Sequence, residues 1–371
     1  MEILAIFNAK GGVGKTTSAV NLAACFAAMD QRVVLFDLDA QGNATSSLGL
    51  KNAPDIGTYD VITGKAKITD ALRPTFMDRL SLIGATRNLA TIDVDMALGD
   101  TTSGILSRVV QPIADDFDLL ILDCSPTFGS MTMNALVSAN AVLVPSQLSP
   151  YSHDGLIRTW TILARVRQEL HPALRVVGVL PTFCDPETLS ENQIMRAMQA
   201  EFGNLVDEQG IPSDPQLFGA ATAAGLPASI FQPDAPAATA YVTLAARLLA
   251  VGEGGAGVPL DPARTDGPPA RIRRLDEAPP ADAELQVAAL QRLGAWRTKA
   301  EADGVLAANV NVPPVDEGAM QTAAYELPSR DDPDTGGPWD RAGRWSLSVG
   351  GVLLIGVLAF LLGWAVGSGR F

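Results

Sequence analysis

A glycine-rich loop between an apolar strand and an apolar helix, close to the start of the chain, constrains the fold more than any other feature. Residues 3–7 read Ile-Leu-Ala-Ile-Phe, a run of strand length, and residues 8–17 follow as Asn-Ala-Lys-Gly-Gly-Val-Gly-Lys-Thr-Thr. A segment of helical period comes next, with Val20, Leu22 and Phe26. Glycines let successive backbone N–H groups turn toward one anion, and the helix adds its positive N-terminal end. The segment therefore predicts a phosphate-binding loop.

Further apolar runs of strand length recur along the first 250 residues. They lie at 33–36, 119–122, 141–144 and 176–180, and segments of helical period separate them. Continuous apolar strands that alternate with helices are typical of a parallel sheet buried on both faces. We therefore expect an α/β fold in which a mostly parallel, twisted sheet carries helices on both faces.

Composition divides the chain into three parts. Residues 1–250 have the pattern of a globular domain, whereas residues 251–340 are rich in Gly, Pro, Ala and Asp and are interpreted as a linker. Within this linker, the segment 281–302 has helical period and predicts a short helix, either a docking helix or a transient one. The third part, residues 345–369, is expected to be a transmembrane helix.

The transmembrane prediction depends on hydropathy and length. No charged residue occurs from Trp345 to Gly369, and the apolar core would be about 30 Å long as a helix, close to the hydrocarbon thickness of a bilayer. Arg341 and Arg344 precede the segment, and positively charged residues beside a membrane span usually lie on the cytoplasmic side. The part of the chain before the segment is therefore expected in the cytoplasm. A buried core helix is the alternative, but the segment has no polar face. We expect a single-pass C-terminal anchor in a bacterial-type inner membrane.

The residues after the predicted strands suggest roles in phosphate and metal binding. Lys15 is placed to neutralise the β- and γ-phosphates, and the Thr16 hydroxyl to ligate Mg²⁺. Asp37 and Asp39 follow a strand at i, i+2 spacing, which puts both on one side of an extended chain. Asp123 ends another apolar strand, where it could hold the Mg²⁺ shell. The alternatives are an ordinary turn, solvated strand ends and a helix cap.

An extra lysine, Lys10, stands directly before the glycines, and the generic loop pattern fails at Ala9. The sequence Lys-Gly-Gly-Val-Gly-Lys-Thr-Thr resembles the deviant P-loop of the ParA/MinD family of ATPases. Residues 37–45 resemble the family's switch I, with Ala40 in place of a usual proline, and residues 123–126 resemble its switch II. The resemblance covers about residues 1–250 and implies the fold of the P-loop NTPases.

The resemblance implies ATP and Mg²⁺ as cofactors, and slow, Mg²⁺-dependent ATP hydrolysis stimulated by an activating partner protein. Lys10, Lys15 and Asp39 would be catalytic, with Asp39 orienting the attacking water. In the family, the lysine equivalent to Lys10 reaches the phosphates of a second protomer, which implies an ATP-bound homodimer. Metal would be held by Thr16, Asp37 and Asp123. Nucleotide contacts would come from Gly11, Gly12, Val13, Gly14, Lys15, Thr16, Thr17, Thr182 and Pro212, the last two near the adenine.

The net charge of the chain indicates whether DNA is a binding partner. The whole chain has a formal net charge of −14, and residues 1–250 contain 16 Lys and Arg against 25 Asp and Glu, a net charge of −9. Residues 211–220 carry no positive charge. DNA binding is therefore disfavoured, although folding could still gather arginines on one surface.

Three hypotheses of function follow. The leading one is an ATP-dependent dimerisation switch that positions or partitions a cargo at the membrane. The first alternative is a DNA-partitioning ATPase, for a chromosome or plasmid, tethered to the membrane. The second is an ATP-binding membrane scaffold with little hydrolysis.

Overall fold

The computed structural model describes residues 1–306 apart from 51, 99–103, 186, 251–270 and 280. The chain divides into two compact units, Met1–Pro313 and Pro314–Phe371. The second unit lies wholly outside the described residues. All described helices and strands therefore belong to the first unit.

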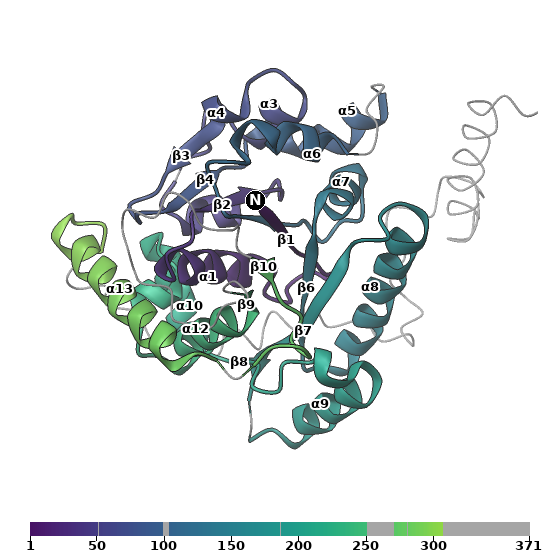
Figure 1. Ribbon diagram of the computed structural model, residues 1–371, viewed down its shortest axis with the longest axis vertical. Coiled ribbons are helices and arrows are strands. Elements are labelled where there is room, and N and C mark those ends of the chain that lie inside the picture. The colour runs from purple at the N-terminus through teal and green to yellow at the C-terminus, as the bar shows by residue number, and fades with distance from the viewer. Residues whose placement is uncertain (51, 99–103, 186, 251–270, 280, 307–371) are drawn as a thin grey trace, which may run out of the picture. The chain divides into compact units, whose positions relative to one another are not determined.

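An eight-stranded sheet forms the centre of this unit (Figure 1), in the order β3-β4-β2-β5-β1-β6-β7-β8. All its pairings are parallel except that of β3 with β4. Because β1 lies between β5 and β6, the loop after β1 is at the point where the strand order changes direction, a usual ligand site in such sheets. The strands are β1 (Glu2–Ile6), β2 (Val33–Asp37), β3 (Leu72–Pro74), β4 (Leu80–Ile83), β5 (Leu119–Asp123), β6 (Ala141–Gln147), β7 (Arg175–Cys184) and β8 (Ile211–Pro212).

Helices cover both faces of the sheet because successive strand residues point to opposite sides. Leu4 and Ile6 of β1 belong to a core that includes α1, α2 and α10–α13, whereas Ala5 and Phe7 belong to a core with α3–α9. This arrangement confirms the expected α/β fold. The helices are α1 (Lys15–Ala28), α2 (Asn43–Ser47), α3 (Thr58–Ile62), α4 (Ile68–Ala71), α5 (Ile92–Leu98), α6 (Ile105–Val110), α7 (Ser130–Ser138), α8 (Pro150–Glu169), α9 (Leu189–Phe202), α10 (Pro215–Ala224), α11 (Ala228–Phe231), α12 (Pro236–Leu248) and α13 (Ala283–Ala302).

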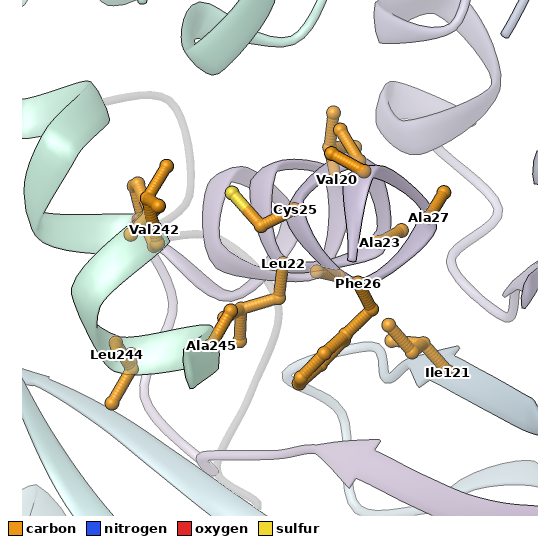
Figure 2. Packing of buried hydrophobic residues seen from close by; sticks show 14 of the residues in the cluster. Val20, Leu22, Ala23, Cys25, Phe26, Ala27, Ile121, Val242, Leu244 and Ala245 are labelled. Atoms are coloured by element: carbon orange, nitrogen blue, oxygen red, sulfur yellow. The ribbon is translucent and has the colours of Figure 1, made fainter. Parts of the chain in front are cut away.

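Helix α1, which follows the glycine loop, is buried along almost its whole length. Phe26 points toward Ile121 of β5, and Leu22 points toward Ala245 of α12 (Figure 2). Five alanines of α1 are fully buried, and their small side chains allow neighbouring elements to approach closely: Ala19, Ala23, Ala24, Ala27 and Ala28. The helix is thus fixed between the sheet and the C-terminal helices.

The structure differs from the expected linker at residues 271–306. β10 (Arg271–Ile272) pairs antiparallel with β9 (Leu249–Ala250), and α13 packs against α1, α11 and α12. Leu293 is fully buried and Trp296 is 4% exposed. The boundary expected at residue 250 therefore falls inside the compact unit, because the apolar face of α13 is buried in the main core rather than left in solvent.

The anchor expected at residues 345–369 lies outside the described residues, as does the part of the expected linker from residue 307 onward. Among the helices that the structure describes, none combines the length and the apolar character needed to cross a membrane.

Candidate nucleotide-binding site

The glycine loop after β1 has the backbone conformation that an anion-binding loop needs. Gly12 and Gly14 lie in the left-handed region, with φ of 72° and 81°, and α1 begins immediately after Gly14, at Lys15. Gly11 and Gly12 are exposed and face open space, whereas Val13 is buried. Thr16 and Thr17, in the first turn of α1, are half-buried. The loop therefore leaves room for a ligand above the N-terminal end of α1.

Lys15 is a buried ammonium group at this helix end. It is 7% exposed, and its Nζ donates a hydrogen bond to the Lys10 carbonyl oxygen at 2.9 Å. Burial lowers the pKa of Lys15, while the nearby acids, Asp123 first among them, act in the opposite direction. A positive charge placed beside the loop is suited to phosphate oxygens.

The loop is held against α8 by polar contacts of its first residues. Asn8 is buried, accepts from the Lys10 N–H at 2.9 Å, and donates to the Pro145 carbonyl oxygen at 2.7 Å. Thr159 of α8 donates to the Asn8 side chain at 2.8 Å. Lys10 points toward the start of α8, where its Nζ donates to Ser152 Oγ at 2.7 Å. Sequence reasoning missed Asn8 and Thr159, because these two hydrogen-bonded residues are 151 positions apart along the chain.

Two buried acids end neighbouring strands. Asp37 of β2 and Asp123 of β5 are paired in register, and both are fully buried. Asp37 Oδ1 accepts from the Asp39 N–H at 3.1 Å, and its Oδ2 accepts from the Thr45 hydroxyl at 2.6 Å and N–H at 2.9 Å. Burial raises the pKa of Asp37 to about 6. Both carboxylate oxygens of Asp37 thus already accept hydrogen bonds from the protein.

Asp123 is different, because both its carboxylate oxygens are buried without a hydrogen-bond partner among the described residues. Burial, followed by the neighbouring Asp37, raises its pKa well above the ordinary value. The Thr16 hydroxyl lies close enough to lower the pKa of Asp123 but does not form a hydrogen bond of standard geometry with it. An unsatisfied buried carboxylate beside a hydroxyl suits a hard cation such as Mg²⁺.

The described residues contain no group of three or more His, Cys, Asp or Glu side chains that could hold a metal by themselves. Mg²⁺ is usually bound by one or two protein oxygens together with waters and substrate phosphates. Thr16 and Asp123 would fit such an ion, whereas both oxygens of Asp37 already accept hydrogen bonds from the protein.

Asp39 lies in the turn between β2 and α2 and is half-buried. Its Oδ1 accepts from the Gln41 N–H at 3.0 Å, and it is close enough to Lys15 to act on that pKa. The structure thus brings together Lys15, Thr16, Asp37, Asp39 and Asp123 around the start of α1. The assignment of Asp39 to the attacking water stays a prediction.

Thr182 and Pro212, expected near an adenine, lie at the ends of β7 and β8. The Thr182 hydroxyl donates to the Val13 carbonyl oxygen at 3.0 Å, and its methyl group faces Gly14. Thr182 is therefore used to hold the loop. Pro212 is half-buried and paired with Cys184, and its contact with adenine stays a prediction.

Comparison with known proteins gives consistent results. A family model described as an AAA domain matches residues 1–176. The sporulation initiation inhibitor protein Soj of Bacillus subtilis is 34% identical over 252 residues, which cover 68% of this chain and 99% of Soj. The chromosome partitioning protein ParA of Caulobacter vibrioides is 32% identical over 252 residues, covering 67% of this chain and 94% of ParA.

A solved structure, cobyrinic acid a,c-diamide synthase of Mycobacterium smegmatis with a bound ATP analogue and magnesium, is also similar. It is 30% identical, covers 67% of this chain and 94% of its own, and superposes with a TM-score of 0.57. The similarity to these proteins extends over about two thirds of the chain.

Proposed function

Because this chain belongs to the Soj/ParA family of P-loop ATPases, we propose that it is an ATP-dependent dimerisation switch that positions or partitions a cargo at the membrane. The observation that carries the proposal is Asp123, a buried carboxylate beside Lys15 and Thr16 whose oxygens have no hydrogen-bond partner in the part of the chain that the structure describes. Such a group is costly in the free protein and becomes satisfied when a cation and a phosphate chain arrive. The family relationship supports ATP as the source of that phosphate chain.

The roles of the chain's own residues follow from their places. Backbone N–H groups of residues 11–17 and the Lys15 ammonium hold the phosphates, and Thr16 and Asp123 hold Mg²⁺. The bound Mg²⁺ supplies charge stabilisation for the phosphoryl group. Asp39 orients the attacking water, and the protein otherwise contributes positioning, which is sufficient for slow hydrolysis.

Lys10 is proposed to act between two copies of the chain. In the free chain its ammonium is held by Ser152 and, at 3.5 Å, by Ser149. Hydroxyl groups are weaker partners for an ammonium than phosphate oxygens, so a nucleotide in a second protomer would attract it away. The ATP-bound state is then a homodimer, and hydrolysis, stimulated by an activating partner protein, separates it.

The apolar segment 345–369 is proposed to anchor the chain in a bacterial inner membrane, with the ATPase domain in the cytoplasm. A full span binds essentially irreversibly, so nucleotide would control dimerisation and partner capture rather than attachment. Membrane fractionation of cells that express the full chain, compared with a chain ended at residue 344, tests this proposal. Recovery of both chains in the soluble fraction would overturn it.

A DNA-partitioning ATPase is the second candidate, because ParA of Caulobacter vibrioides, a similar protein, is a chromosome partitioning protein. The net charge of −9 over residues 1–250 stands against it. The scaffold alternative, which binds ATP with little hydrolysis, is disfavoured by the gathering of Lys15, Thr16, Asp39 and Asp123.

One experiment separates these functions. The full chain, purified in a mild detergent, is compared in ATP and in ADP for phosphate release, dimerisation and retention on DNA, with Lys15→Ala as the matched control. We expect ATP-dependent dimers, slow phosphate release and no retention on DNA. ATP-dependent dimers that hold DNA, in a salt-sensitive way, would establish the second candidate instead. Dimers without phosphate release would favour the scaffold, and the absence of ATP-dependent dimers would overturn the switch.

A further inference from the structure

Thr45 of α2 links the two ends of the turn between β2 and α2, residues 38–42, through its contacts with Asp37. Thr45 is 2% exposed, and its hydroxyl and N–H both donate to Asp37 Oδ2. The other oxygen, Asp37 Oδ1, accepts from the Asp39 N–H at 3.1 Å. A carboxylate with hydrogen bonds on both oxygens cannot rotate freely about its χ2 angle. The Asp37 carboxylate therefore links Thr45 to the backbone of Asp39.

The Thr45 hydroxyl is also tied to the end of β4. Its oxygen accepts from the Ala85 N–H at 2.9 Å while its proton goes to Asp37 at 2.6 Å. A hydroxyl that donates once and accepts once has its orientation fixed. The methyl group is equally constrained, because a Cβ added at Gly84 would lie 3.0 Å from Thr45 Cγ2. Thr45 is thus clamped on both its polar and its apolar side.

A second threonine at the same junction, Thr58, forms side-chain hydrogen bonds with main-chain atoms only, among the described residues. Thr58, fully buried at the start of α3, donates through its hydroxyl to the Asp37 carbonyl oxygen at 2.6 Å. It leaves the Asp37 carboxylate and the Asp39 N–H untouched. The two threonines therefore have similar burial and one strong hydroxyl hydrogen bond each, but only Thr45 holds the carboxylate that supports Asp39.

We propose that Thr45 is a positioning residue for ATP hydrolysis: it orients the Asp37 carboxylate, which fixes the Asp39 backbone and so places the Asp39 side chain toward the nucleotide. The proposal rests on the proposed function, in which Asp39 acts on the water. Binding of nucleotide depends on the loop and Lys15, whereas Thr45 acts on the Asp37 carboxylate and, through it, on the Asp39 backbone. Its loss is expected to change turnover and to leave nucleotide affinity nearly unchanged.

The test compares four full-length chains: wild type, Thr45→Val, Thr45→Ser and Thr58→Val. Thr45→Val, which keeps the shape and loses the hydroxyl, is expected to lower kcat by about 10- to 100-fold, because small displacements of catalytic groups have effects of this size. Its dissociation constant for ATP changes by less than about threefold, a free-energy difference below about 0.7 kcal/mol. Thr45→Ser keeps the hydroxyl and restores kcat, and Thr58→Val retains the wild-type kcat.

Equal losses of kcat in Thr45→Val and Thr58→Val would overturn the proposal, since general loosening of the junction would then be sufficient. Full activity of Thr45→Val would also overturn it. If Thr45→Val does not fold, Thr45→Ala supplies a second chain without the hydroxyl.

Amide hydrogen exchange in the nucleotide-free chain provides a readout that is independent of hydrolysis. A peptide that covers residues 38–44 is expected to exchange faster in Thr45→Val than in wild type or Thr58→Val, because the Asp39 N–H loses its fixed acceptor. Unchanged exchange would contradict the proposal. If the wild-type chain binds ATP but does not hydrolyse it, the proposed function fails, and exchange at this peptide still decides whether Thr45 positions Asp39.

Discussion

Two regions at opposite ends of α1 differ in the partners of their buried acids. One is the α13 surface, the face of α13 (Ala283–Ala302) that packs against α1, α11 and α12. The other is the nucleotide edge, where β2 and β5 end at Asp37 and Asp123. Asp30, at the far end of α1, has its Oδ1 in ion pairs with Arg79 at 2.7 Å and Arg292 of α13 at 3.1 Å. At the other end of α1, Asp123 is buried with neither oxygen hydrogen-bonded among the described residues. Asp30 is thus paired with arginines inside the fold, whereas Asp123 has no hydrogen-bond partner among the described residues, which agrees with its proposed role in binding Mg²⁺.

A second acid at a distance from the nucleotide edge follows the same rule. Asp207 is 3% exposed and is paired with Arg247 of α12. Substitutions on the α13 surface should therefore change stability and leave turnover per folded molecule unchanged, whereas substitution of Asp39 at the nucleotide edge should do the reverse.

The largest expected effect is on the α13 surface. Trp296→Ala removes an almost fully buried aromatic side chain, and we expect a loss of about 3–5 kcal/mol in the free energy of unfolding. Urea denaturation of the full chain measures it. Val287→Ala, on the same helix but 54% exposed, is the control and should change the free energy by less than about 0.5 kcal/mol. Equal effects of the two substitutions would mean that α13 does not pack as described.

At the nucleotide edge, Asp39→Ala should act on turnover alone. If Asp39 orients the water, kcat falls by about 100-fold or more, since positioned acid–base groups contribute effects of this size. Phosphate release at saturating ATP measures kcat, and the urea midpoint checks that stability is retained. Asp39→Asn, which keeps an acceptor for the Gln41 N–H, is expected to lose turnover as well. Retention of kcat in both variants would remove Asp39 from the mechanism.

The buried acid of β2 gives a pH dependence with a defined sign. The pKa of Asp37 is about 6 in the folded chain against 3.8 in the unfolded reference, so between these values the folded state binds more protons. The contribution of Asp37 to stability is thus present below about pH 4 and is lost as pH rises toward 6. Without Mg²⁺ or nucleotide, Asp37→Asn should remove this loss, so the variant gains stability relative to wild type over that window.

Asp95→Asn provides the matched control for this pH dependence. Hydrogen bonds from Thr91 and Tyr59 lower the pKa of Asp95, so its contribution is present at neutral pH and is lost as pH falls. The difference between variant and wild type should therefore run in the opposite direction with pH. A difference for Asp37→Asn that does not vary between pH 4 and 6 would contradict the predicted burial of its charge.

The smallest effect is expected for Arg292→Met. The Arg292 side chain is 28% exposed and Arg79 remains to pair with Asp30, so the loss in free energy of unfolding should be about 1 kcal/mol or less. Urea denaturation at low and high salt measures it, and salt should reduce the difference. A loss as large as that of Trp296→Ala would mean that Asp30 depends on α13 for its charge compensation.

The sequence was sufficient to predict the fold of the first 250 residues and the elements that carry the site. Strand periodicity and the loop of residues 8–17 depend only on residues that are close together along the chain, so one sequence is sufficient to predict them. The helix at 281–302 was also predicted, but its docking surface was not, because the partners of Leu293 and Trp296 on α1 lie more than 260 residues away. The same limit hid the contacts of Lys10 with Ser152 and of Asn8 with Thr159.

The role proposed for Thr45 could not be predicted from the sequence, for a different reason. It lies within the segment that carries the resemblance, but a threonine after Gly-Asn-Ala has several ordinary explanations, such as a helix start. Only the packing of β2, β4 and α2 against one another shows that its hydroxyl joins Asp37 to Ala85.

The five buried alanines of α1 have a mechanical consequence. With the sheet on one side and α12 and α13 on the other, a helix with such short side chains cannot tilt or slide without colliding with its neighbours. We therefore expect α1 to keep its position. If the proposed switch responds to nucleotide, we therefore expect the movement in the turns at the strand ends, where backbone can move without repacking the interior, rather than in α1.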